Sequence, residues 1–234
     1  MAKIIAGNWK MNLRRESATV LAEAVKGRDV WVFPTFTLLD AVSSVLENVG
    51  AQDLSIEADG AFTGDVSAEQ ILDAGCKMVL VGHSERRHGH LEDAAMLRCK
   101  LDRAIEAGLK PLYCVGETLA QREIGEAENV VRGMLETLKG LKAEDLAAVA
   151  YEPVWAIGTG QTASSEQAND MHKFARDVLK KLNLGDVLLL YGGSAKLENA
   201  AELLSQKYVD GLLVGGASLK IESLTAMLDI AQGS

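Results

Sequence analysis

Residues 78–87 read Met-Val-Leu-Val-Gly-His-Ser-Glu-Arg-Arg, an apolar run of strand length followed, after one glycine, by an imidazole and four other polar residues. The segments that lead into Asn8 and into Glu152 have the same arrangement, because a polar group closes a short apolar run in each. Apolar residues at successive positions are typical of parallel strands covered on both faces. If these runs are parallel strands of one barrel, the polar groups that follow them meet at one mouth of that barrel.

Runs of this kind recur along the chain. They cover residues 4–6, 30–33, 54–56, 78–81, 112–115, 147–151, 187–191 and 212–214. The stretches between them carry apolar residues at helical spacing, for example Ala94, Leu97, Leu101, Ala104 and Ile105, or Val130, Val131, Met134, Leu135 and Leu138. Eight β-then-α units close naturally into a barrel, so we predict an α/β protein with a (β/α)8 barrel fold.

The third run and the closure of the sheet leave alternatives open. Around residues 54–56, Asp53, Ser55 and Glu57 alternate with apolar residues, and an exposed hairpin strand would have the same pattern. An open doubly wound sheet is the alternative for the whole fold, but it would need a glycine fingerprint after the first strand. Gly7-Asn8-Trp9-Lys10 is not such a fingerprint, so the pattern favours the barrel.

The composition favours a single domain over residues 1–234. Hydrophobic residues make up 48% of the chain, which is enough to form a sizeable core. Only three prolines occur, and no Gly/Ser-rich spacer interrupts the chain. Two domains would therefore have no obvious boundary.

The charge and the cysteines restrict the expected partners. A net charge of -9 argues against nucleic acid or an anionic membrane as a partner, because either needs a basic face. Small molecules therefore remain as the expected partners. Cys76, Cys99 and Cys114 fit neither a disulfide framework nor a zinc-ligand pattern, which indicates a reducing cytoplasm. We find no signal peptide and no run long enough to span a membrane.

Five motifs follow one another along the chain: Ala6-Gly7-Asn8-Trp9-Lys10-Met11-Asn12, Gly82-His83-Ser84-Glu85-Arg86-Arg87, Tyr151-Glu152-Pro153-Val154-Trp155-Ala156-Ile157-Gly158-Thr159-Gly160, Tyr191-Gly192-Gly193-Ser194 and Val214-Gly215-Gly216-Ala217-Ser218. Together they resemble the motifs of triosephosphate isomerases, over essentially the whole chain. The resemblance implies a TIM barrel that interconverts dihydroxyacetone phosphate and D-glyceraldehyde 3-phosphate by proton transfer through an enediolate, in glycolysis and gluconeogenesis. It implies no metal and no cofactor.

By this resemblance Glu152, at the end of the sixth strand, is the base. An exposed carboxylate is a weak base, so the site must exclude water, and a lid is expected. Residues 153–163 match that lid, with Pro153 at one hinge. At the other hinge Gln161 replaces the lysine common in the family, a difference that concerns lid opening.

His83 and Lys10 are implied to be the electrophilic groups, together with Asn8. A helix that opens directly after His83 disfavours positive charge on the ring, so we expect a neutral imidazole that donates a hydrogen bond to the substrate oxygens. Lys10 supplies fixed positive charge to the enediolate and the phosphate dianion. Asn8 faces the same way along an extended backbone and can donate an amide hydrogen bond.

The remaining site residues come from the glycine clusters and their surroundings. Glycines let backbone N–H groups approach a phosphate closely. The resemblance assigns phosphate binding to Gly158, Ser194, Gly215 and Gly216. We assign supporting roles to Glu85, which could orient Lys10 and His83 by hydrogen bonding, and to Cys114, which could equally be a buried packing residue.

Residues 60–65 resemble the projecting loop through which the family forms homodimers. Phe62 and Thr63 are its central residues, and a second copy of the chain is the expected partner. Asp65 replaces a usual glutamate, and residues 53–59 depart from the usual pattern, so the strength of the interface is open. A long loop with one aromatic residue could otherwise be only a barrel insertion.

Two other functions fit parts of the pattern. In a barrel aldolase, Lys10 would form a Schiff base with a phosphosugar carbonyl. In a non-catalytic phosphosugar-binding barrel, the glycine clusters would bind phosphate without turnover. The presence of Glu152, His83 and Lys10 together argues against the second, and fold alone could not decide, because barrels host many reactions.

Overall fold

A computed structural model describes residues 3–157 and 163–233. Its strands are β1 (Ile4–Asn8), β2 (Trp31–Phe33), β3 (Gly50–Ala51), β4 (Met78–Val81), β5 (Lys110–Val115), β6 (Ala148–Tyr151), β7 (Leu189–Tyr191) and β8 (Gly211–Val214). They form one eight-stranded parallel sheet, in the order β2-β1-β8-β7-β6-β5-β4-β3. A parallel bridge between Val32 and Val49 joins its two edges. The barrel prediction is therefore confirmed.

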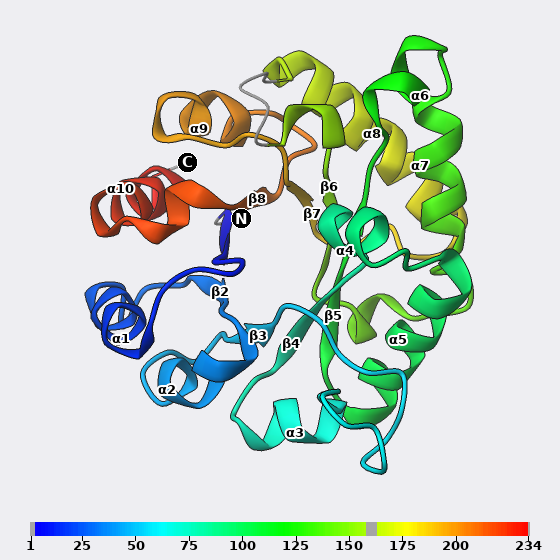
Figure 1. Ribbon diagram of the computed structural model, residues 1–234. Coiled ribbons are helices and arrows are strands. Elements are labelled where there is room, and N and C mark those ends of the chain that lie inside the picture. Colours follow the sequence, from blue (N-terminus) through cyan, green and yellow to red (C-terminus); the bar gives the residue numbers. More distant parts are fainter. Residues whose placement is uncertain (1–2, 158–162, 234) are drawn as a thin grey trace.

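Helices surround the sheet on its outer side (Figure 1). They are α1 (Arg15–Ala24), α2 (Leu39–Ser43), α3 (Ala68–Asp73), α4 (Ser84–Gly89), α5 (Ala94–Ala107), α6 (Leu119–Glu123), α7 (Ala127–Glu136), α8 (Ser165–Lys181), α9 (Leu197–Leu204) and α10 (Ile221–Gln232). Short 3-10 turns lie at η1 (Phe36–Leu38), η2 (Ala143–Asp145), η3 (Val154–Ala156) and η4 (Gly216–Leu219).

Helix α5 illustrates how local sequence sets an element. Asp93 caps its start by accepting a hydrogen bond from the backbone N–H of Met96. Leu97 and Leu101 are buried, as their spacing predicts. The helix ends at Gly108, which has a left-handed backbone that glycine adopts without strain. Helix α7 ends at Glu136, so the predicted helical residue Leu138 lies just beyond it, although it is still buried.

The apolar residues divide between two layers, which explains why the strands lack alternation. Side chains such as Ala6, Phe33 and Leu112 fill the inside of the barrel. Val79 and Val149 belong to the larger layer between the sheet and the helices. Both faces of each strand are thus covered, and the polar groups that close the strands remain at the rim.

The predicted third strand was wrong in position. The strand is Gly50–Ala51, and residues 54–56 lie in the loop that follows. A Cβ at position 50 would lie 2.5 Å from the Phe33 ring, so packing requires glycine there. Because glycine has no apolar side chain, the strand does not appear as an apolar run in the sequence. In this loop Leu54 is buried and Ile56 is exposed, so the alternation of polar and apolar residues over positions 53–57 does not mark one buried face of a strand. Across the described residues, we find no helix with the length and apolarity needed to span a membrane.

Candidate active site

A pocket of about 420 Å³ opens at the carboxyl end of the barrel strands. It is lined by Asn8, Lys10, Asn12, His83, Glu152, Ile157, Gly192, Gly193, Ser194, Ala195, Lys196, Leu213, Gly215, Gly216, Ala217 and Leu219. Groups that close the first, fourth, sixth, seventh and eighth strands therefore meet in one place, as the sequence predicts. In barrels of this class, reactive groups lie at this end of the strands.

Asn8 is the last residue of β1, Lys10 follows it, and hydrogen bonds hold both residues in place. The backbone of Lys10 is left-handed, with φ of 51°, which is uncommon for a residue with a side chain. Asn8 Oδ1 accepts a hydrogen bond from the Lys10 N–H at 3.0 Å, and Gln52 Nε2 donates to the Lys10 carbonyl at 2.8 Å. These two bonds hold the chain in this conformation. The Asn8 amide NH₂ is left as the donor that can face the pocket.

His83 lies at the N-cap of α4, so the predicted helix does begin directly after it. Its Nδ1 accepts a hydrogen bond from the backbone N–H of Glu85 at 3.2 Å. Because Nδ1 is an acceptor, the neutral ring carries its proton on Nε2, a tautomer assigned from this geometry. That Nε2 lies 3.1 Å from Oε1 of Glu152. The arrangement suits a neutral imidazole that donates through Nε2.

Glu152 is buried directly after β6 and lines the pocket together with His83. Its second oxygen, Oε2, accepts a hydrogen bond from the backbone N–H of Ser84 at 3.0 Å. Glycines make room for it: a Cβ at Gly116 would overlap its carbonyl oxygen, and one at Gly192 would lie 2.9 Å from its Cγ. Packing against these glycines therefore holds the buried side chain at the pocket.

Glu85 and Cys114 both lie where a supporting role requires. Glu85 Oε1 accepts a hydrogen bond from Lys10 Nζ at 2.6 Å, whereas His83 is contacted mainly through the Glu85 backbone N–H. Cys114 is buried inside the barrel beside Glu152. Burial raises the pKa of the Cys114 thiol well above its usual range, and the negative charge of Glu152 raises it further. This cysteine is therefore an uncharged neighbour of the carboxylate.

Three of the four residues assigned to phosphate binding line the pocket, namely Ser194, Gly215 and Gly216. At Gly216 an added Cβ would meet no atom of the described residues within 4 Å, its two chain neighbours aside, so packing among these residues does not require glycine there. At Gly193 packing does require it, because a Cβ would overlap the hydroxyl of Tyr191. The fourth assigned residue, Gly158, lies outside the described residues.

The predicted lid lies only partly within the described residues. Pro153 and η3 are described, whereas Gln161 falls outside with the rest of residues 158–162. Trp155 of η3 donates its indole N–H to Oε1 of Glu117 at 2.8 Å. The same oxygen accepts from the Tyr151 hydroxyl and from Arg122, each at 3.1 Å. A single buried carboxylate therefore fastens the segment that leaves β6.

Sequence reasoning missed Glu117 and Gln52. Glu117 is fully buried, and its only signal is its position two residues after the end of β5, at the rim where Glu152 directly follows β6. Gln52 donates to the carbonyls of both Lys10 and Phe33, each at 2.8 Å. It directly follows β3, and the sequence pattern places that strand too late for Gln52 to be recognised as a rim residue. In the part of the chain that the structure describes, no three histidine, cysteine or acidic side chains gather as metal ligands.

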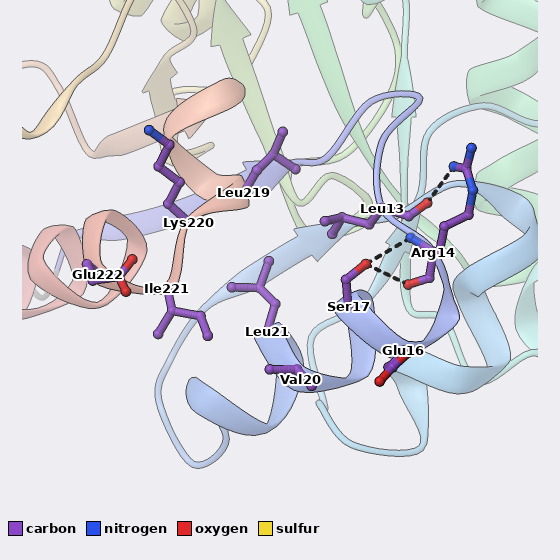
Figure 2. Close-up of a pocket in the computed structure, with 10 residues that line it drawn as sticks. All are labelled: Leu13, Arg14, Glu16, Ser17, Val20, Leu21, Leu219, Lys220, Ile221 and Glu222. Carbon is purple, nitrogen blue, oxygen red and sulfur yellow. Dashed lines mark hydrogen bonds between the residues drawn. The ribbon is translucent and has the colours of Figure 1, made fainter.

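A second pocket, of about 530 Å³, lies between α1 and the start of α10 (Figure 2). Its base is apolar, with Val20, Leu21 and Ile221 facing one another. The Ser17 hydroxyl is engaged with the Arg14 backbone, at 3.0 Å from both its nitrogen and its oxygen. None of the predicted site residues lines this pocket, so the chemistry belongs to the barrel mouth.

Comparison with known proteins agrees with this geometry. A family model described as triosephosphate isomerase matches residues 3–231. The triosephosphate isomerase of Hahella chejuensis is 46% identical over 243 aligned positions, covering 98% of this chain and 98% of its own. That of Cupriavidus pinatubonensis is 47% identical over 239 positions, covering 96% and 98%.

The chain belongs to the triosephosphate isomerase family. As a triosephosphate isomerase it interconverts dihydroxyacetone phosphate and glyceraldehyde 3-phosphate, a step of glycolysis, without a cofactor. The substrate is thus a small dianion. The net charge of the protein is -9, so binding a dianion requires a locally positive pocket mouth, and Lys10 is one of the cations that line it.

Proposed function

We propose that Glu152 is the base of the isomerisation and that His83, Lys10 and Asn8 bind the reacting oxygens. The observation that carries the proposal is the 3.1 Å separation between His83 Nε2 and Glu152 Oε1, in the pocket that Lys10 also lines. A base and an electrophile that share one small substrate need this proximity.

In the proposed reaction, Glu152 takes a proton from C1 of dihydroxyacetone phosphate, and the electrons of that C–H bond form the enediolate. The developing negative charge on the oxygens is stabilised by the Nε2–H of His83, the Lys10 ammonium and the Asn8 amide. A proton also passes from O1 to O2, and the protonated Glu152 returns a proton to C2, so that C1 becomes the aldehyde carbonyl and O2 a hydroxyl. Oε1 lies near His83 Nε2 and Oε2 accepts from the Ser84 N–H, and each oxygen has a second acceptor position that the substrate can use.

We propose that Ser194, Gly215 and Gly216 bind the phosphate through hydroxyl and backbone N–H groups. Their position after β7 and β8 is where barrel enzymes commonly bind phosphate. The open space at the Gly216 Cα supports close approach of a ligand to the backbone. The assignment of Gly158 to the same group remains a proposal from resemblance.

An aldolase reaction through Lys10 is less well supported. A Schiff base requires an amine that is free to attack the carbonyl, but Lys10 Nζ is paired with a Glu85 carboxylate oxygen at 2.6 Å. A barrel that only binds phosphosugar would not need a buried carboxylate within reach of an imidazole.

We also propose that residues 1–234 form one domain and that the chain forms a cytoplasmic homodimer through the loop around Phe62 and Thr63. The loop is fastened on both sides, because Ser55 Oγ donates to Asp65 Oδ2 at 2.6 Å and Ser67 hydrogen-bonds to Asp59. Phe62 is 45% exposed on it, as an interface residue would be in a single chain. Mass photometry and activity over a dilution series test this: a monomer at every concentration would contradict it.

The variant Glu152→Gln tests the role of the base. It keeps the size and the hydrogen-bonding capacity of the side chain but removes the basic carboxylate, so we expect kcat to fall by at least 10³-fold. Glu136→Gln is the control, because Glu136 is exposed at the end of α7 on the outside of the barrel. If Glu152→Gln folds and retains kcat within tenfold of the wild type, the assignment of the base is wrong.

A further inference from the structure

Four charged side chains form a cluster beside α4, outside the pocket. Lys100 Nζ lies 2.5 Å from Asp53 Oδ1 and 2.6 Å from Glu92 Oε1, and an Arg86 guanidinium nitrogen lies 2.7 Å from both Asp53 Oδ2 and Glu92 Oε1. Their side chains are 14% (Asp53), 30% (Arg86), 2% (Glu92) and 5% (Lys100) exposed. We name this group the α4 cluster. Two cations and two anions balance, which allows burial at this depth.

Asp53 contributes to the cluster through both of its oxygens. Oδ1 contacts Lys100, and Oδ2 contacts Arg86. An asparagine offers one acceptor oxygen, and its NH₂ group would face whichever cation remained. The two contacts therefore require a carboxylate at position 53.

The cluster is connected to the reacting groups by short paths through the backbone. The Arg86 N–H donates to the carbonyl of His83 at 2.8 Å. A displacement of Arg86 would therefore move the backbone of His83, which lies within one helical turn of it. The neighbour of Asp53, Gln52, donates to the carbonyl of Lys10. Two adjacent residues of one loop thus hold the two segments that carry His83 and Lys10.

Helix α4 has a second attachment that does not depend on Asp53. Arg87 donates to the carbonyl oxygens of Gly82 and Cys114, each at 2.7 Å, which fastens the barrel-facing side of the helix. Loss of Asp53 would leave this side in place and free the outer side. We therefore expect a small displacement of His83 and Glu85 rather than loss of the helix.

We propose that Asp53 is a positioning residue for the isomerisation, acting through Arg86 to hold α4, and with it His83 and the Lys10–Glu85 pair, in register with Glu152. This inference rests on the roles proposed above for His83 and Lys10. The described phosphate residues, Ser194, Gly215 and Gly216, follow β7 and β8, and none of the ion pairs of the cluster reaches them, so the effect falls on stabilisation of the enediolate and not on phosphate binding.

The test measures kcat, KM and two dissociation constants for Asp53→Asn. 2-Phosphoglycolate places a carboxylate where the enediolate oxygens develop, whereas inorganic phosphate probes only the glycine clusters. We expect kcat and the affinity for 2-phosphoglycolate each to fall about tenfold, because a small misplacement of a group that acts in the transition state is costly. KM and the affinity for inorganic phosphate should stay within twofold.

Glu69→Gln is the matched control. Glu69 pairs with Arg103, another cation of α5, and the ion pairs of Arg103 in the described residues go to Glu69 and Glu106 and not to α4. It should lower the melting temperature without changing kcat or either dissociation constant. Mass is measured at the assay concentration for every variant.

Three outcomes would overturn the inference: unchanged kcat in Asp53→Asn, an equal loss of affinity for both probes, or a loss of kcat that is explained by dissociation of the oligomer. If Asp53→Asn does not fold, Arg86→Lys replaces it, because a single ammonium keeps the charge but cannot bridge both carboxylates as the guanidinium does. Failure of the proposed catalytic roles would appear separately, as kcat retained by His83→Gln or Lys10→Met.

Discussion

His172 should make the stability of this protein fall steeply in mild acid. The side chain is fully buried on α8, between Tyr151 and Tyr191, with ring centroids 5.9 and 6.3 Å away. Its Nδ1 is 3.1 Å from the carbonyl of Tyr208, and within the described residues Nε2 has no hydrogen-bond partner. Burial lowers the pKa of His172 from 6.5 to about 4, against a smaller opposing effect of the Tyr208 carbonyl.

The sign and the size follow from proton linkage. The folded pKa lies below the unfolded value, so between about pH 6.5 and pH 4 the unfolded chain binds a proton at this site that the folded chain does not. Stability is therefore full above pH 6.5 and falls as the pH drops. One residue contributes a loss of about 2 kcal/mol by pH 5 and about 3 kcal/mol near pH 4.

The assay compares urea unfolding of the wild type and of His172→Asn at one protein concentration, from pH 7.5 to pH 4. An asparagine amide can replace Nδ1 as the donor to Tyr208 and does not titrate. The smaller asparagine side chain leaves a cavity, which lowers the free energy of unfolding by about the same amount at every pH. We expect the difference in unfolding free energy between the two proteins to shrink by about 3 kcal/mol on acidification. A constant difference would refute the reasoning.

Two further predictions concern glycines and cysteines. Gly193→Ala should destabilise the fold, because its methyl group would overlap the Tyr191 hydroxyl, whereas Gly216→Ala should keep the melting temperature and raise KM for triose phosphate. Circular dichroism and steady-state kinetics measure both, and equal melting temperatures for the two variants would contradict the first. Iodoacetamide at pH 8 should alkylate the exposed Cys99 and spare Cys114, whose buried thiol has a raised pKa, and mass spectrometry of the native protein would show either result.

Most of the barrel could be predicted from local pattern. A parallel strand covered on both faces has successive apolar residues, so β4 was located at its observed bounds. The strand that failed, β3, is short and contains Gly50, whose missing side chain makes room for Phe33. A periodicity analysis depends on apolar side chains, so it cannot detect a strand position where packing requires glycine.

The residues that form the site could be predicted in the same way, but the way in which they are held in place could not. His83 and Glu152 could be placed at one rim because the ends of parallel strands converge there. The left-handed backbone of Lys10 and the contacts of Gln52 and Glu117 depend on partners far away in the sequence. Such contacts form only in the closed barrel, and no local pattern encodes them.

Deuterium incorporation into dihydroxyacetone phosphate tests the central claim most directly. The substrate is incubated in D₂O with wild-type protein or with Glu152→Gln, and proton NMR follows the C1 signal. The wild type should exchange the C1 proton with solvent as it isomerises the substrate, while the variant, which still carries His83 and Lys10, should leave the signal unchanged. Exchange by the folded variant at the wild-type rate would show that the proton is removed by a group other than the Glu152 carboxylate.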